Sequence, residues 1–96
     1  MAENLTYADA PDAETPAEGP IPSMRKRIDE IDATLIGLWR ERAELSRQIG
    51  ALRVATGGTR LVLSREQEIV ERFGEAIGAD GAQLALLVLR AGRGPL

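Results

Sequence analysis

The 96-residue sequence contains no cysteine and no histidine. It therefore has no thiol nucleophile, no disulfide, no metal site of cysteine or histidine ligands, and no triad of serine, histidine and aspartate. No apolar run approaches the roughly 18 residues of a membrane-spanning helix, and no charged and then apolar leader resembles a signal peptide. From these absences we expect a cytoplasmic protein without a membrane partner.

Lysine is nearly absent, and positive charge comes almost entirely from arginine. Of the 12 basic residues only Lys26 is not arginine. The arginine bias suits bidentate recognition of carboxylates, although a GC-rich genome gives the same bias without functional meaning. The first 20 residues hold five acidic residues and no basic one, so residues 21–96 have a net charge of +2. This mild charge and only three aromatic residues argue against a nucleic-acid partner.

Composition divides the chain into a tail and one helical domain. Residues 1–20 are rich in alanine, acidic residues and proline and lack hydrophobic periodicity, which predicts a disordered acidic tail. Residues 21–96 are expected to form the ordered domain. Ser23 is a suitable N-cap and no helix breaker precedes Gly57, so the sequence predicts one long helix from Met24 to Ala55. At about 1.5 Å per residue this helix would be about 48 Å long.

Two shorter helices are predicted after a loop at residues 56–63. Ser64 and Gln67 form a capping box for the first of them, and Asp80 caps the second, which should stop at Gly92. The predicted inward residues are Ile69, Val70, Phe73 and Ile77, then Leu84, Leu87 and Val88. No strand is predicted. Because the short helices cannot cover the long one, a second copy of the chain is its simplest cover.

An arginine interrupts the apolar seam of the long helix. Apolar residues at heptad spacing form this seam: Ile28, Ile31, Leu35, Leu38, Leu45, Ile49 and Leu52. Arg42 takes a seam position, and a permanent charge there needs an anion. Arg53 lies eleven residues further on nearly the same face, about 16 Å along the axis. Arg25 is too distant to join them within one chain but could do so from an antiparallel partner.

The second predicted helix adds Arg65 in its first turn and places Glu66 on its inward face. Two interpretations of Arg42 follow. Glu66 could neutralise Arg42 in a structural ion pair, although buried pairs stabilise poorly compared with apolar residues. Alternatively, four arginines for one glutamate leave an excess of positive charge that favours a polyanionic ligand.

The segments MRKRIDEIDATLIGLWRERAELSRQIGALR and SREQEIVERF closely resemble the all-α chorismate mutases. The segments GGTRLVLSRE and LRAGRGPL are similar to the delta subclass of that family. The resemblance covers residues 24–96. The family spacing is matched jointly by Arg25, Asp32, Arg42, Gly50, Arg53, Arg65 and Glu66.

This resemblance implies an intertwined homodimeric helical bundle that converts chorismate to prephenate by a Claisen rearrangement, without a cofactor. Arg42 and the Arg25 of a second copy would hold the substrate carboxylates. Arg53 would approach a carboxylate and the ether oxygen. Glu66 would accept a hydrogen bond from the ring hydroxyl, with Arg65 framing the same side. The catalytic residues are thus expected to be Arg53, Glu66 and Arg42.

The sequence also departs from the pattern of the bifunctional relatives. Val62 is an expected substrate-binding position at which those relatives have an acidic residue, and the chain ends at Leu96 before their C-terminal serine and glutamine. Members of the delta subclass are typically weak alone and activated by DAHP synthase, which the resemblance implies as a partner here. Residues 92–96 are expected to form a flexible tail that such a partner could reorganise.

Two other functions stay open at this point. A related lyase that removes pyruvate from isochorismate shares the fold but usually has a lysine on a mobile loop, unlike Gly57, Gly58 and Thr59. A non-catalytic helical interaction module would fit the heptads and Val62. Such a module would have no need of Arg42 on its seam.

Overall fold

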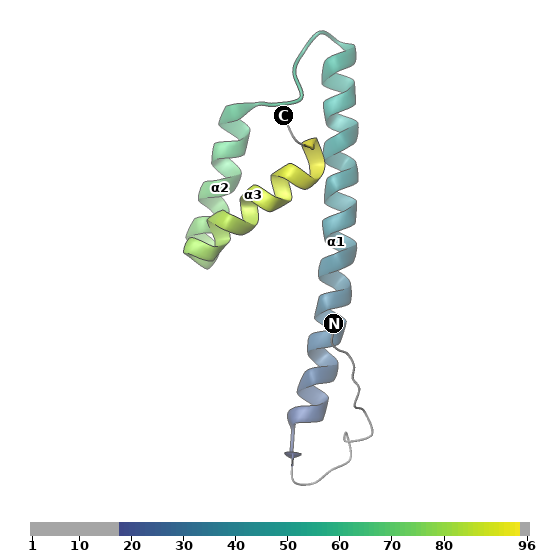
Figure 1. Cartoon of the computed structure of the whole chain (residues 1–96), viewed down its shortest axis with the longest axis vertical. Coiled ribbons are helices and arrows are strands. Elements are labelled where there is room, and N and C mark those ends of the chain that lie inside the picture. Colours follow the sequence, from purple (N-terminus) through teal and green to yellow (C-terminus); the bar gives the residue numbers. More distant parts are fainter. Residues whose placement is uncertain (1–17, 95–96) are drawn as a thin grey trace. The chain divides into compact units, whose positions relative to one another are not determined.

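A computed structural model describes residues 18–94 of the chain, and these residues contain three helices and no strand. The helices are α1 (Ile21–Ala55), α2 (Leu63–Ile77) and α3 (Ala79–Arg93) (Figure 1). The predicted all-α class, with one long and two shorter helices, is confirmed. The predicted acidic tail falls largely on residues 1–17, outside the described part. Within residues 18–94 no helix has the length and apolar character needed to cross a membrane.

The described residues divide into two compact units, residues 18–36 and residues 37–94, and α1 contributes to both. In the first unit α1 begins at Ile21, three residues before the predicted start. Pro22 favours this start. Proline has no backbone N–H, and the N–H groups of a first helical turn have no partner within the helix in any case. Ser23 is therefore inside the first turn and not the N-cap, and its hydroxyl donates to the carbonyl of Pro20 at 3.0 Å.

The predicted N-caps of the two short helices are also wrong, each by two residues. The N-cap of α2 is Val62, in an extended conformation and without a side-chain cap, so Ser64 lies inside the first turn. Gly78 is both the C-cap of α2 and the N-cap of α3, and its φ of 101° suits glycine. This single residue reverses the chain, which leaves Asp80 in the first turn of α3 and not at its cap.

The core of the second unit lies between α2 and α3. Its centre is Ile69, Ala85 and Leu89, with Val70 and Phe73 packed against them. Gly81 makes this approach possible, since a Cβ there would collide with the carbonyl of Phe73. The residues of α3 that become buried are consequently Gly81, Ala85, Val88, Leu89 and Gly92.

This stripe differs from the predicted inward faces. Ile69, Val70, Phe73 and Val88 are placed inward as predicted. Ile77, Leu84 and Leu87 are 58%, 40% and 55% exposed, so their prediction as core is wrong for the single chain. Because Gly81 contacts α2 closely, the side of α3 that faces α2 contains small residues such as Gly81 and Ala85. Leu84 and Leu87 lie on other sides of α3.

The apolar seam of α1 is left uncovered within the single chain. In the first unit Ile28 and Leu35 are more than half exposed, and in the second unit Leu45, Ile49 and Leu52 are as well. The buried residues of α1 are Ala43 and Gly50. The described residues therefore do not bury the face that the heptad pattern marks as buried.

Candidate functional site

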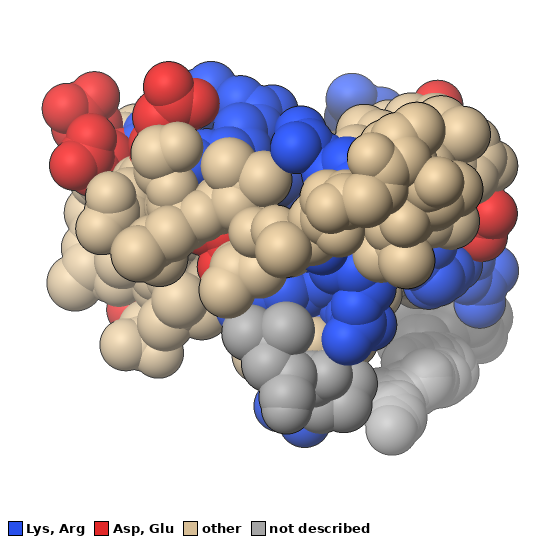
Figure 2. Space-filling view, turned by 90° about the horizontal axis from the view of Figure 1, so that it is seen from above, with Lys and Arg blue, Asp and Glu red and all other residues tan. Residues whose placement is uncertain are grey.

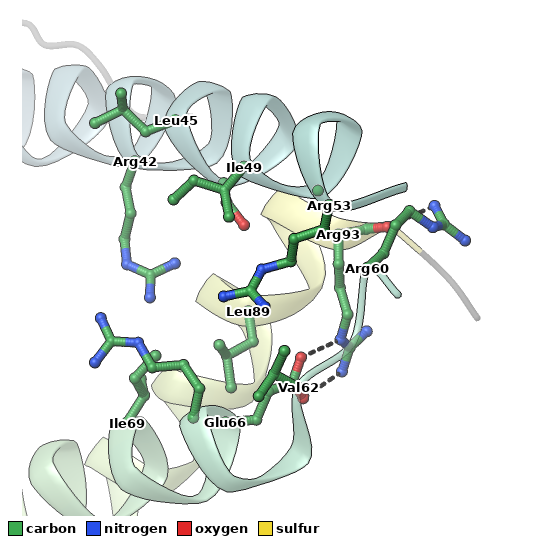
Figure 3. A pocket seen from close by; sticks show the side chains of 13 residues that line it. Arg42, Leu45, Ile49, Arg53, Arg60, Val62, Glu66, Ile69, Leu89 and Arg93 are labelled. Carbon is green, nitrogen blue, oxygen red and sulfur yellow. Dashed lines mark hydrogen bonds and ion pairs between the residues drawn. The ribbon is translucent and has the colours of Figure 1, made fainter. Parts of the chain in front are cut away.

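A cavity of about 310 Å³ lies within the second unit, where α1, the following loop, α2 and α3 each contribute side chains. Its lining consists of Arg42, Leu45, Ser46, Ile49, Gly50, Arg53, Arg60, Val62, Arg65, Glu66, Ile69, Leu89 and Arg93. Five of the six predicted site residues are in this set. Figure 3 shows the side chains of Arg42 and Arg53 extending from α1 into the cavity.

Arg25, the sixth predicted residue, belongs to the first unit, on the N-terminal part of α1. It is not among the residues that line the cavity. The single chain thus brings together Arg42, Arg53, Val62, Arg65 and Glu66 but not Arg25, which was expected to come from a second copy.

Arg42 has no ion-pair partner among residues 18–94. Its pKa lies below the usual arginine value, first because the side chain is partly withdrawn from water and then because the positive charges of Arg65 and Arg72 are near. The structural interpretation, in which Glu66 neutralises Arg42, is wrong for this chain. A partly desolvated guanidinium beside two others is a place where an anion would bind favourably.

Glu66 instead forms a bidentate ion pair with Arg93 of α3 (Figure 3). The Nε of Arg93 donates to Oε2 at 2.6 Å, and its Nη2 donates to Oε1 at 3.2 Å. These hydrogen bonds raise the pKa of Arg93 above its usual value. Both oxygens of the only acidic side chain in the cavity lining are therefore oriented by one guanidinium.

Arg53 is in the last turn of α1, where a positive side chain interacts favourably with the helix dipole. The loop closes directly on this turn, because the backbone N–H of Gly58 donates to the Arg53 carbonyl at 2.7 Å. Gly57 precedes it with a φ of 89°, a conformation that favours glycine. The two glycines therefore hold the end of α1 at the rim of the cavity.

The C-terminal end of α3 packs against α1 beside the cavity. A Cβ at Gly92 would collide with the side chain of Ser46, so only glycine permits this approach. Arg60 in the loop donates from Nη1 to the carbonyl of Arg93 at 3.1 Å, and its guanidinium points away from the cavity (Figure 3). Residues 92 and 93, expected in a flexible tail, belong instead to α3, whose C-cap is Gly94.

Sequence reasoning missed Arg93 as part of the site. Its partner Glu66 lies 27 positions earlier, a separation that helical periodicity does not reveal. The C-capping glycine at position 94, with a φ of 78°, was the available signal that the helix extends to Arg93. The cavity is also lined by Leu45 and Ile49, which are predicted only as seam residues, and by Leu89, which the sequence pattern does not single out.

The cavity is strongly electropositive. Five arginines line it against one glutamate. Glu66 pairs with Arg93, Arg65 forms an exposed ion pair with Glu68 at 3.5 Å, and Arg60 points away, which leaves Arg42 and Arg53 facing the cavity. Figure 2 shows Lys and Arg side chains exposed at several places on the surface seen from above. No group of acidic side chains that could hold a metal ion occurs in residues 18–94. The arrangement can bind a small polyanion and offer it one carboxylate as a hydrogen-bond acceptor.

Comparisons with known proteins agree with this geometry. Residues 24–87 match the family described as chorismate mutase type II. The chain is 51% identical over 76 residues to the intracellular chorismate mutase of Mycolicibacterium smegmatis, covering 79% of this chain and 73% of that protein. The intracellular chorismate mutase of Mycobacterium tuberculosis is also 51% identical over 76 residues, with coverage of 79% and 71%.

A solved structure is similar over most of both chains. It is the non-covalent complex of DAHP synthase and chorismate mutase from Corynebacterium glutamicum with a bound transition state analogue. The likeness has a TM-score of 0.79 with 39% identity and covers 83% of this chain and 96% of that chain. The chain described here belongs to the type II chorismate mutase family.

Proposed function

We propose that this protein is a chorismate mutase that converts chorismate to prephenate. The observation that supports this most directly is the cavity in which Arg42 and Arg53 extend towards the same space as Glu66. Chorismate is a small dicarboxylate with a ring hydroxyl, and the cavity offers arginines for its carboxylates and an acceptor for its hydroxyl. The reaction belongs to the synthesis of phenylalanine and tyrosine.

The rearrangement suits a site without a nucleophile or a cofactor. One ether C–O bond breaks while one C–C bond forms in the same cyclic step, so no proton and no electron leaves the substrate. The site must hold the flexible substrate in its chair-like conformer and stabilise negative charge that grows on the ether oxygen. Arg42 is proposed to bind a carboxylate, and Arg53 is proposed to contact a carboxylate and the ether oxygen.

The other side of the substrate is proposed to face α2. Glu66 accepts a hydrogen bond from the ring hydroxyl, which fixes the orientation of the ring. Val62 is an apolar contact, and Arg65 frames the same side of the cavity. The main chain of Val62 also accepts from the backbone N–H of Glu66 at 3.1 Å, so the first turn of α2 is held where these side chains are needed.

An intertwined homodimer is part of this proposal. It is supported by the exposed seam of α1 in each unit, where Leu35 and Leu52 are 60% and 68% exposed. Burying apolar area at roughly 25 cal/mol per Å² would stabilise such a dimer substantially. A second copy would also contribute its Arg25 to the cavity, because the Arg25 of the same chain does not line it. Two sites would form in each dimer.

DAHP synthase is the proposed macromolecular partner. The related Corynebacterium protein was solved in a complex with that enzyme. The end of α3 lines the cavity of this chain through Arg93, so a partner bound near residues 94–96 could change the site directly. The two relatives from mycobacteria are named intracellular, and we propose the same location, the cytoplasm, for this protein.

Product identity separates this proposal from the two alternatives. The purified protein would be incubated with chorismate and, separately, with isochorismate, and prephenate and pyruvate would be measured. Prephenate from chorismate is expected, whereas pyruvate from isochorismate would favour the lyase. A bicyclic transition-state analogue should also raise the melting temperature, because a ligand of the native state stabilises it. No product from either substrate and no thermal shift would favour the interaction module.

A further inference from the structure

The ion pair between Glu66 and Arg93 differs from the other ion pairs among residues 18–94. The other three join residues three positions apart within one helix, and all their side chains are at least 53% exposed. Arg93 and Glu66 join α3 to α2 and are only 18% and 17% exposed. Exposed pairs contribute little, whereas a sheltered bidentate pair fixes the geometry of both partners.

Arg93 is itself held in place from several directions. Its Nη1 donates to the carbonyl of Gly94 at 3.1 Å, and its own carbonyl accepts from Arg60 at 3.1 Å. The preceding residue, Gly92, packs directly against Ser46 of α1. The backbone around Arg93 is therefore held by contacts to α1 and to the loop, and its guanidinium is held by Glu66 and by the carbonyl of Gly94.

The pair restrains Glu66 without using up its capacity to accept hydrogen bonds. A carboxylate has about four lone-pair directions, and Arg93 occupies one on each oxygen. Each oxygen thus keeps a direction for a further donor. A free glutamate would lose rotamer freedom on binding a hydroxyl, and Arg93 removes much of that freedom beforehand.

We propose that Arg93 is a positioning residue, which orients the Glu66 carboxylate so that it accepts from the substrate hydroxyl in the reactive geometry. The inference rests on the proposed mutase function. Arg93 acts through Glu66 and does not contact the reacting atoms. The planar fork of arginine is required, because lysine would offer a single point of charge and could not hold both oxygens.

The test compares Arg93→Ala with Arg90→Ala in the full chain. Arg90 is an exposed arginine in the same last turn of α3, and it provides the matched control. Displacing a positioned group by about 1 Å can reduce the rate by about 100-fold, so we expect Arg93→Ala to lower kcat/KM by ~10- to 100-fold. Arg90→Ala should behave as the wild type, and Arg93→Lys should recover only part of the loss.

A double-mutant cycle shows whether Arg93 acts through Glu66. The double variant Arg93→Ala with Glu66→Gln should be no slower than Glu66→Gln alone. Added guanidinium chloride at tens of millimolar should partly restore Arg93→Ala and leave Glu66→Gln unchanged. A general loss of structure would instead lower the melting temperature, persist in the Glu66→Gln background and resist guanidinium.

The outcomes distinguish the two levels of the proposal. An active wild type with an equally active Arg93→Ala variant would overturn the positioning role and leave the mutase intact. A faster Arg93→Ala variant would overturn the positioning role as well, since the ion pair would then hinder Glu66 from accepting the substrate hydroxyl. A wild type that does not convert chorismate would overturn the proposed function, and positioning for this reaction with it.

Discussion

Replacing Arg42 by leucine should make the fold more stable and the protein less active. Arg42 takes an apolar seam position, is partly withdrawn from water, and has no ion-pair partner within residues 18–94. The positive charges of Arg65 and Arg72 are near enough to repel it. Leucine restores the heptad and removes a charge that the folded state does not compensate.

The size of both effects can be worked out from the site. Because most of the Arg42 charge remains hydrated, the gain in unfolding free energy is on the order of 1 kcal/mol, at the low end for buried charges. For a domain of this size that corresponds to a rise in Tm of about 4–8 °C. A lost hydrogen bond to a charged group costs about 1.5–3 kcal/mol, which lowers kcat/KM roughly 10- to 100-fold.

The assay pairs thermal denaturation with chorismate consumption at equal protomer concentration, because oligomerisation makes Tm depend on concentration. Arg40→Leu is the matched control, since Arg40 is an exposed arginine of α1 outside the seam and should show neither effect. A lower Tm for Arg42→Leu would contradict this prediction, because Arg42 would then be a structural partner in the folded protein.

Three further predictions concern catalysis, activation and assembly. Arg53→Ala should lower turnover at least 100-fold, because roughly 3 kcal/mol of transition-state stabilisation is lost, while the sedimentation coefficient of the protein stays unchanged. Near-normal turnover would contradict the catalytic role of Arg53. Deleting residues 93–96 should abolish activation when the mutase rate is measured with increasing DAHP synthase. The deletion of residues 95–96 is the comparison, because it keeps Arg93. Unaltered activation of the variant that lacks residues 93–96 would refute a role for this end of the chain. Leu35→Asp should yield monomers in sedimentation and remove activity, because Leu35 is 60% exposed on the seam; an active monomer would contradict the two-copy site.

The sequence predicts the elements of this fold better than their faces. The long helix follows from a heptad pattern in which Arg42 is the one charged position, and its end follows from Gly57. The rotation of α3 does not follow from hydrophobicity, because Gly81 and Gly92 determine it through close contacts with Phe73 and Ser46. Leucines 84 and 87 satisfy an amphipathic pattern and still lie exposed in the single chain.

The sequence likewise predicts those site residues that stand out in a local pattern, and it misses those that depend on contacts between distant positions. Arg42 was recognisable because a charge on an apolar seam breaks a local rule, and Arg53 because it follows at three helical turns. Arg93 breaks no local rule, and its partner is Glu66 on another helix. Arg25 belongs to the first unit and does not line the cavity, so its role in the site stays a prediction that requires a second copy of the chain.

Chorismate conversion is the most direct test of the account. The absorbance of chorismate would be followed with the purified protein alone and with DAHP synthase of the same organism, and prephenate would be identified as the product. We expect conversion by the protein alone and a faster rate with the partner. No conversion in either mixture would contradict it, because the electropositive cavity would then serve a purpose other than this rearrangement.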